Sequence, residues 1–276
     1  MGETLCLDEV ALSNGELYTI LTNANAKTQK GSLIAMIEGV KSENILKILT
    51  KIPISVRKKV KEISTDMANN MEKVAKQAFP NAATVTDRFR VAKLVSEAVQ
   101  EIRIKHRWKA IDLENKEVET AKKNKIKYVS PTFENGDTAK QLLARSRYLL
   151  FKPKNKWTDK QSKRAEILFK EYPDIKHAHE LSMMFRNIYE TAKTKEDAEI
   201  SFNKWFQKVE QYKYSSFVTA SQSINNHKET ILNFFVNRTT NALAESFNSK
   251  LKAFRTVFRG VKDLSFFIFR VTNIFG

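Results

Sequence analysis

Short apolar runs separated by polar turns fill the first forty residues, in the pattern typical of strands. Segments 5–12 and 17–22 are rich in strand-forming residues, and Ser13-Asn14-Gly15 lies between them. Asn-Gly is a strong hairpin signal, because both residues tolerate the positive φ angles of a type I′ turn. A further strand is expected at 32–38. Together these segments predict an antiparallel three-stranded meander.

The pattern next alternates between helical and strand periods. Apolar residues recur at helical spacing in 42–51, with Ser42 as the expected N-cap. Strands are predicted at 60–65 and 83–86, with a helix at 69–79 between them. The resulting order, β-β-β-α-β-α-β, is the topology of ribonuclease H.

Strand signals are weak from residue 88 onward, where helical periods take over. We expect one long basic helix at 88–108 and an exposed charge run at 122–127 (KKNKIK). Farther on, Phe202, Trp205, Phe206 and Val209 form one helical stripe. The fold class is therefore predicted as α/β, with a ribonuclease H-like mixed sheet interrupted by a large all-α insertion. The expected parts are 1–95 for the first part of the core, 96–235 for the helical insertion, and 236–276 for C-terminal helices that complete the core.

Composition and charge indicate a folded protein with a polyanionic partner. The chain has 276 residues, of which 42% are hydrophobic, and its formal net charge is +17. Such an excess favours nucleic acid as the partner, although a generically basic cytosolic protein is the alternative. No apolar run approaches the roughly 18–20 residues of a membrane span, and no signal peptide is recognisable. We expect a cytoplasmic, nucleoid-associated protein without a membrane partner.

The cysteine and histidine residues of the chain limit the disulfides and metal sites that it could form. Cys6 is the single cysteine, which rules out internal disulfides and a Cys-x-x-Cys zinc knuckle. His177 and His179 have no third ligand nearby in the sequence, so a surface or packing role is preferred over metal binding.

The segment 145–164 interleaves basic residues with Tyr148, Phe151 and Trp157. Such a mixture suits a nucleic-acid surface, and aromatic residues at these spacings are also typical of a core.

A lone carboxylate, Glu245, lies on a late helix at 241–258 that is otherwise rich in Asn, Lys and Arg. The buried stripe of this helix is predicted as Leu243, Phe247, Leu251, Phe254 and Phe258. Glu245 lies on the opposite face with Asn241, Asn248 and Lys252. That face could line a cleft, while a solvated surface glutamate is the simpler alternative.

Two aspartates on predicted strands change the interpretation of Glu245. Asp8 lies within an apolar strand, where an unpaired carboxylate would be costly to bury. Asp66 ends the fourth strand and could alternatively cap the next helix. In the ribonuclease H topology the first and fourth strands are neighbours, so the two aspartates would meet, and a helix over the sheet could add Glu245. Three carboxylates suit Mg²⁺, with Mn²⁺ as a substitute, and two such ions can drive phosphodiester displacement.

The chain resembles the catalytic domain of bacterial insertion-sequence DDE transposases of the ISL-three group. The resemblance covers nearly the whole chain and rests on four segments: LDEVALSNGELYTIL, TDMANNMEKVAKQAFPNAATVTDRFRVAKLVSEAV, RSRYLLFKPKNKWTDKQ and ILNFFVNRTTNALAESFNSKLKAFRTVFRGVKDLSFFIFRV. It implies that Asp8, Asp66 and Glu245 are the catalytic, metal-binding acids of a ribonuclease H-like core. Asp87 is a candidate fourth carboxylate, with helix capping as the alternative. The family's usual histidine near Asp87 is Arg90 here.

Two functions follow from the resemblance. The first is a DNA transposase that cuts and joins DNA at insertion-sequence ends, as a homo-oligomer when active. The second is a remnant that binds DNA without cleaving it. The family's usual zinc-binding and helix-turn-helix region is not found ahead of the first catalytic strand, so a separate DNA-binding chain is an expected partner. The residues predicted to contact DNA are Arg88, Arg90, Arg145, Arg147, Asn248, Lys250, Lys252, Arg255 and Arg259.

Overall fold

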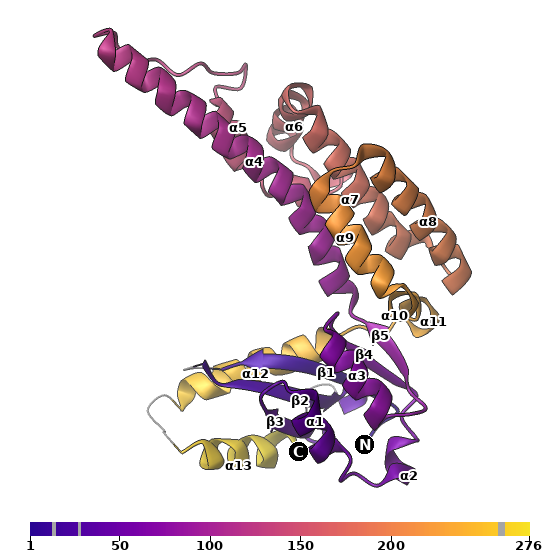
Figure 1. Cartoon of the computed structure of the whole chain (residues 1–276). Coiled ribbons are helices and arrows are strands. Elements are labelled where there is room, and N and C mark those ends of the chain that lie inside the picture. Colours follow the sequence, from indigo (N-terminus) through magenta and orange to yellow (C-terminus); the bar gives the residue numbers. More distant parts are fainter. Residues whose placement is uncertain (13–14, 27–28, 259–262) are drawn as a thin grey trace. The chain divides into compact units, whose positions relative to one another are not determined.

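The computed structural model describes the chain except for residues 13–14, 27–28 and 259–262. The described residues form two compact units (Figure 1). The sheet unit comprises residues 1–91 and 227–276, and the helical unit comprises residues 92–226. In the described part of the chain, no helix is both long and apolar enough to span a membrane.

A five-stranded mixed sheet forms the centre of the sheet unit, with the strand order β3-β2-β1-β4-β5. The pairs β1–β2 and β2–β3 are antiparallel, and the pairs β1–β4 and β4–β5 are parallel. Each strand lies within two residues of its predicted position, so the strand predictions are confirmed. The predicted turn at Ser13 and Asn14 lies outside the described residues. The strands are β1 (Thr4–Ala11), β2 (Leu17–Asn23), β3 (Leu33–Glu38), β4 (Glu62–Thr65) and β5 (Ala83–Thr86).

Helices cover both faces of this sheet. On one face, Leu5 and Leu7 of β1 join a core with the buried residues of α1 (Ser42–Leu49) and α3 (Asn69–Ala78). On the other face, Val10 of β1 packs in a core with α12 (Ala242–Val257) and α13 (Leu264–Phe275). Successive side chains of a strand point to opposite faces, so Asp8 belongs to the face covered by α12.

One local prediction in this unit was wrong, and one element was not predicted. The N-cap of α1 is Lys41, and the side chain of Ser42 instead reaches the backbone oxygen of Asn70 at 3.5 Å. A short helix, α2 (Ile54–Arg57), lies in a segment for which no element was predicted. It is held by Arg57, whose guanidinium donates to the backbone oxygens of Ile52 and Ala78. The segments that lead into α12 are α10 (Lys228–Leu232) and α11 (Phe234–Asn237).

The helical unit is built around a hydrophobic core between α7 and α8. Phe202, Trp205 and Val209 are buried as the periodicity predicted, and the indole of Trp205 donates to the backbone oxygen of Leu181 at 3.0 Å. The long basic helix does not end near residue 108 but continues to Lys123, since no Gly or Pro interrupts it. The helices are α4 (Arg88–Lys123), α5 (Ala139–Arg145), α6 (Asp159–Glu171), α7 (Pro173–Thr191), α8 (Lys195–Tyr212) and α9 (Ser215–Asn226).

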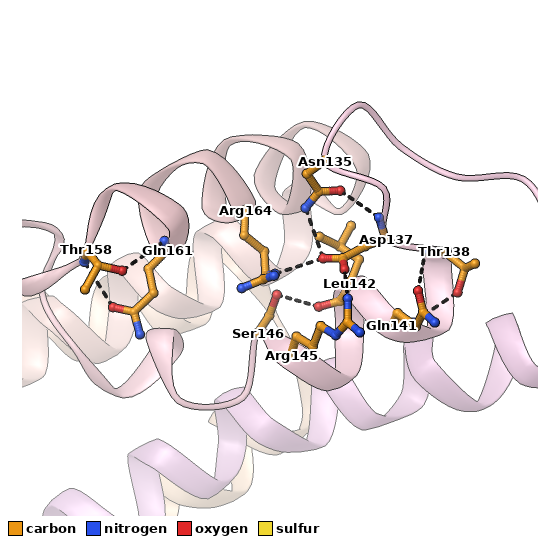
Figure 2. Close-up of polar contacts among 10 residues, drawn as sticks. All are labelled: Asn135, Asp137, Thr138, Gln141, Leu142, Arg145, Ser146, Thr158, Gln161 and Arg164. Atoms are coloured by element: carbon orange, nitrogen blue, oxygen red, sulfur yellow. Dashed lines mark hydrogen bonds and ion pairs between the residues drawn. The ribbon is translucent and has the colours of Figure 1, made fainter.

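A buried carboxylate joins α5 to α6 in this unit. Figure 2 shows that the side chain of Asp137 lies between the guanidinium groups of Arg145 and Arg164. Arg164 Nε donates to Asp137 Oδ2 at 2.9 Å. Capping boxes at Thr138 and Thr158 start the two helices, as the same view shows. Arg145, a predicted DNA contact, therefore has a partner within the protein.

Candidate active site

Asp8 is held in the middle of the central strand. It pairs with Ile20 of β2 in the sheet register, and only 5% of its surface is exposed. Its Oδ2 atom accepts a hydrogen bond of 2.7 Å from the side-chain amide of Asn248 on α12. The amide therefore compensates one of the two carboxylate oxygens.

The other carboxylate oxygen of Asp8 has no hydrogen-bond donor among the residues that the structure describes. Oδ1 is buried, and its ion-pair partner is Arg90, whose Nη2 lies 3.6 Å away. The Oδ1 atom of Asn248 is also buried without a hydrogen bond among the described residues. Buried polar atoms are almost always hydrogen-bonded. Two orphaned oxygens on adjoining side chains are therefore a place where a cation can bind.

The surroundings of Asp8 oppose its ionisation. Burial raises the pKa of Asp8 above its ordinary value. The backbone of Glu9 and the charge of Arg90 act against this rise, whereas the negative charges of Asp66 and Asp87 add to it. Asp66 and Asp87, which directly follow β4 and β5, thus lie close enough to Asp8 for their charges to raise its pKa.

Asp66 directly follows β4 and is half-buried. Its Oδ1 accepts a hydrogen bond of 2.9 Å from the backbone nitrogen of Ala68, which shapes the turn before α3. The N-cap residue of α3 is Ala68, so Asp66 does not cap the helix in the usual sense. This hydrogen bond in the turn uses one of the two carboxylate oxygens of Asp66.

Glu245 lies in the first turn of α12 and is exposed. Partial loss of solvent raises the pKa of Glu245, and the charges of Asp87 and Asp8 raise it further, while the charge of Arg90 lowers it. The structure therefore brings Glu245 within electrostatic reach of Asp8 and Asp87. Among the described residues, however, no group of three or more His, Cys, Asp or Glu side chains is arranged to hold a metal ion. The acids share a region without forming a ready-made metal centre.

Helix α12 is fixed over the sheet by both apolar and amide contacts. Phe247 and Leu251 are fully buried and pack in a core that includes Val10. Asn241 and Asn248 are also buried, and the hydroxyl of Ser64 on β4 donates to the side-chain oxygen of Asn241. These amides face the sheet, whereas Glu245 and Lys252 remain exposed. The prediction that Asn241 and Asn248 share the polar face of Glu245 and Lys252 was therefore wrong, because both amides are buried against the strands. The only sequence signal of this burial is a pair of amides seven residues apart, two helical turns along one face.

The residues predicted to contact DNA occupy different environments. Arg88 and Arg90 lie at the start of α4, and Lys250 and Lys252 are exposed on α12. Arg147 is exposed in the helical unit. Arg259 lies outside the described residues.

Arg255 has a different surrounding. Its guanidinium is buried and donates twice to Glu16, with Nε–Oε2 and Nη2–Oε1 distances of 3.0 and 2.7 Å. Bidentate pairs of this kind fix both side chains. This pair joins α12 to the segment before β2.

Comparison with known proteins identifies the family of this chain. A search of curated proteins returned no match. A family model described as a transposase, DDE_Tnp_ISL3, matches residues 5–271, which is nearly the whole chain and includes Asp8, Asp66 and Glu245. The chain therefore belongs to the DDE_Tnp_ISL3 transposase family.

Proposed function

We propose that this transposase cuts and joins DNA with divalent cations held by Asp8, Asp66 and Glu245. Membership of the family supports an enzyme of the DNA-cleaving kind, with DNA as its partner. The observation that carries the finer proposal is the buried carboxylate of Asp8. Among the described residues one of its oxygens lacks a hydrogen-bond donor, the charges of Asp66 and Asp87 act on Asp8, and the charge of Asp8 acts on Glu245.

The strand arrangement supports a ribonuclease H-like core. Three antiparallel strands are followed by two parallel ones, and the order β3-β2-β1-β4-β5 places β1 beside β4. Asp8 and Asp66 therefore come from neighbouring strands. Because β1 and β4 are parallel, Asp66 at the end of β4 lies toward the same edge of the sheet as the later residues of β1.

The donor atoms fit a hard cation. Asp8, Asp66 and Glu245 offer only oxygen, as the side-chain oxygen of Asn248 does, and oxygen ligands suit Mg²⁺ or Mn²⁺. Two bound ions would supply activation of the attacking oxygen and stabilisation of the leaving oxygen. Within the described parts of the chain, the acids do not form a complete set of metal ligands. Assembly of the ligands would therefore accompany cation binding.

Neighbouring side chains would prepare Asp8 for this role. The hydrogen bond from Asn248 fixes Oδ2 and so orients the carboxylate, leaving Oδ1 without a donor. Arg90 offsets part of the negative charge in the metal-free protein. The bond between Ser64 and Asn241 holds the start of α12, and with it Glu245, over β4.

We assign the predicted DNA contacts according to their surroundings. Lys250 and Lys252 are exposed on the helix that carries Glu245 and would contact backbone phosphates beside the site. Arg255 and Arg145 are bound to carboxylates of the protein itself, so we propose that they brace the fold.

The second function is DNA binding without cleavage. It is favoured by the lack of an assembled metal centre among the described residues and by the ion pair between Arg90 and Asp8. Both functions predict sequence-independent binding to DNA that weakens as salt is added. They differ in whether the DNA backbone is cut.

A plasmid-nicking assay separates the two. Supercoiled plasmid is incubated with the protein and Mn²⁺, and the variants Asp66→Asn and Asp112→Asn are run beside it. Asp112 is an exposed acid of α4 and serves as the matched control. The catalytic proposal expects nicking by the wild type and by Asp112→Asn, with none by Asp66→Asn. Equal binding of DNA by all three without nicking would establish the non-catalytic alternative.

A further inference from the structure

The helical unit contains a buried arginine that forms no ion pair with a carboxylate of the described residues. Arg103 on α4 is only 5% exposed. Its Nε donates to the side-chain oxygen of Gln100 at 2.6 Å, and its Nη1 donates to the backbone oxygen of Leu143 at 2.8 Å. These two hydrogen bonds engage Nε and Nη1 and fix the orientation of the guanidinium. Both acceptors are neutral oxygens, so they do not neutralise its positive charge.

Two further arginines gather around it. Arg107 lies one turn along α4 from Arg103, on the same face of the helix. Arg147 follows α5, and its backbone oxygen accepts a hydrogen bond of 3.3 Å from Gln100. The side-chain amide of Gln100 therefore ties Arg103 to the segment that carries Arg147. We refer to Arg103, Arg107 and Arg147 as the arginine cluster.

The members of the cluster repel one another. Burial lowers the pKa of Arg103, and the charges of Arg107 and Arg147 lower it further. Within the part of the chain that the structure describes, none of the three forms an ion pair with a carboxylate. Arg145 and Arg164 of the same unit differ in this respect, because they share the carboxylate of Asp137 (Figure 2).

The open side of the cluster is accessible. Arg107 and Arg147 are exposed, and the guanidinium of Arg147 lies over the ring of Tyr148, 5.4 Å from its centroid. Tyr148 is itself 66% exposed. A guanidinium supported on an aromatic ring is held in a restricted set of orientations. Two arginines of the cluster are thus exposed to solvent, whereas the third, Arg103, is buried.

We propose that the arginine cluster is a binding site for the phosphodiester backbone of duplex DNA. An anion would relieve the repulsion among three positive charges, and the planar fork of arginine matches phosphate oxygens. The exposed groups of Arg107 and Arg147 would make the contacts, and Arg103 would add charge from below. The proposal rests on DNA as the partner under the proposed function, but it does not depend on cleavage.

The salt dependence of DNA binding tests this site in the full-length protein. Fluorescence anisotropy would follow binding to two duplexes of equal length and unrelated sequence between about 50 and 200 mM salt. The variants are Arg107→Gln, Arg147→Gln and the double substitution. Arg186→Gln is the control, because it removes the same charge from α7 of the same unit, where Arg186 pairs with Glu190. Matching thermal melting curves would show that the variants are folded.

We expect each cluster variant to reduce the slope of log K against log salt by about 0.9, the value for one phosphate contact, and the double variant by about twice that. The loss should be equal on both duplexes, and Arg147→Lys should retain most of the slope. Unchanged slopes, an equal loss in Arg186→Gln, or no binding by the wild type would overturn the proposal. A cluster effect without plasmid nicking would refute only the catalytic function. Nicking with unchanged slopes would refute only this site.

Discussion

Asp8 carries a negative charge that the metal-free fold does not fully compensate. Because the pKa of Asp8 in the folded protein is raised above its ordinary value of 3.8, the folded protein holds this proton more tightly than the unfolded chain does. Ionised Asp8 therefore lowers the free energy of unfolding as the pH rises above 3.8, and the cost is largest above the raised pKa.

We expect Asp8→Asn to stabilise the metal-free protein at neutral pH. The new side chain keeps an oxygen that can accept from Asn248 but carries no charge. The ion pair with Arg90 is lost, yet the Arg90 side chain is 42% exposed, so the contribution of this pair is small. A gain of about 1 kcal/mol would raise the Tm by roughly 2–4 °C. Thermal melts at pH 7 in EDTA measure this shift, and the gain should shrink as the pH approaches 3.8. A lower Tm than the wild type at pH 7 would contradict it.

Residue type together with the predicted strand order and the family resemblance pointed to the candidate acids, but not to their contacts. Asp8 and Asp66 could be selected because carboxylates in or after apolar strands are unusual. The bond from Asn248 to Asp8 could not be predicted. It depends on the rotation of α12 about its own axis, which the packing of Phe247 and Leu251 against the sheet determines. Neighbouring residues of the helix therefore differ in role: Asn248 is buried, whereas Glu245 stays exposed.

At the scale of elements, Asp137 is the link between α5 and α6. Burial alone would raise the pKa of Asp137, but hydrogen bonds from Arg164 and Arg145 and their charges lower it below 3.8. The unfolded chain then takes up the proton at a higher pH than the folded protein does. The stabilisation is therefore present above 3.8 and is lost as the pH falls through the lowered pKa.

We expect Asp137→Asn to lower the free energy of unfolding by about 2 kcal/mol at pH 7, because it removes the buried negative charge that pairs with two arginines. The loss is not larger, because Arg145 is half-exposed and its charge is screened by solvent. Urea unfolding at pH 7 and at pH 3 measures the cost, which should be smaller at pH 3. Glu166→Gln, which alters an exposed acid of α6, is the control and should change little. An equal cost at both pH values would show that the ionised form contributes nothing.

The elements were predictable where one face of the segment is buried. Period-2 and period-3.6 patterns located the five strands, α1, α3 and the aromatic stripe of α8, because burial on one side imposes the period. Helix α4 was predicted too short because its exposed second half carries charged residues on most sides and so has little apolar period. Helix α2 was missed because it is a single turn, held by the guanidinium of Arg57.

At the scale of the molecule, the sequence predicted the neighbours in the sheet but not the state of the acids. The order of strands and helices leaves few topologies, since connections are short and parallel crossovers are right-handed. The ribonuclease H topology, which this order indicates, places β1 beside β4, as the structure has it. That topology cannot decide how closely the three carboxylates approach one another, because their negative charges, which raise the pKa values of Asp8 and Glu245, oppose the approach.

Cation binding should therefore be visible as a local change in the sheet unit. A ligand that binds only the folded state adds about 2.7 kcal/mol of stability at 100 times its Kd, and here the ligands come from β1, the end of β4 and α12. We expect Mn²⁺ to slow amide hydrogen exchange in these segments and to leave exchange in residues 92–226 unchanged. In Asp66→Asn the added protection should be absent, whereas in Asp112→Asn it should persist. Uniform protection of both units, or protection that survives in Asp66→Asn, would mean that the cation binds elsewhere and that the acids of the sheet unit do not form its site.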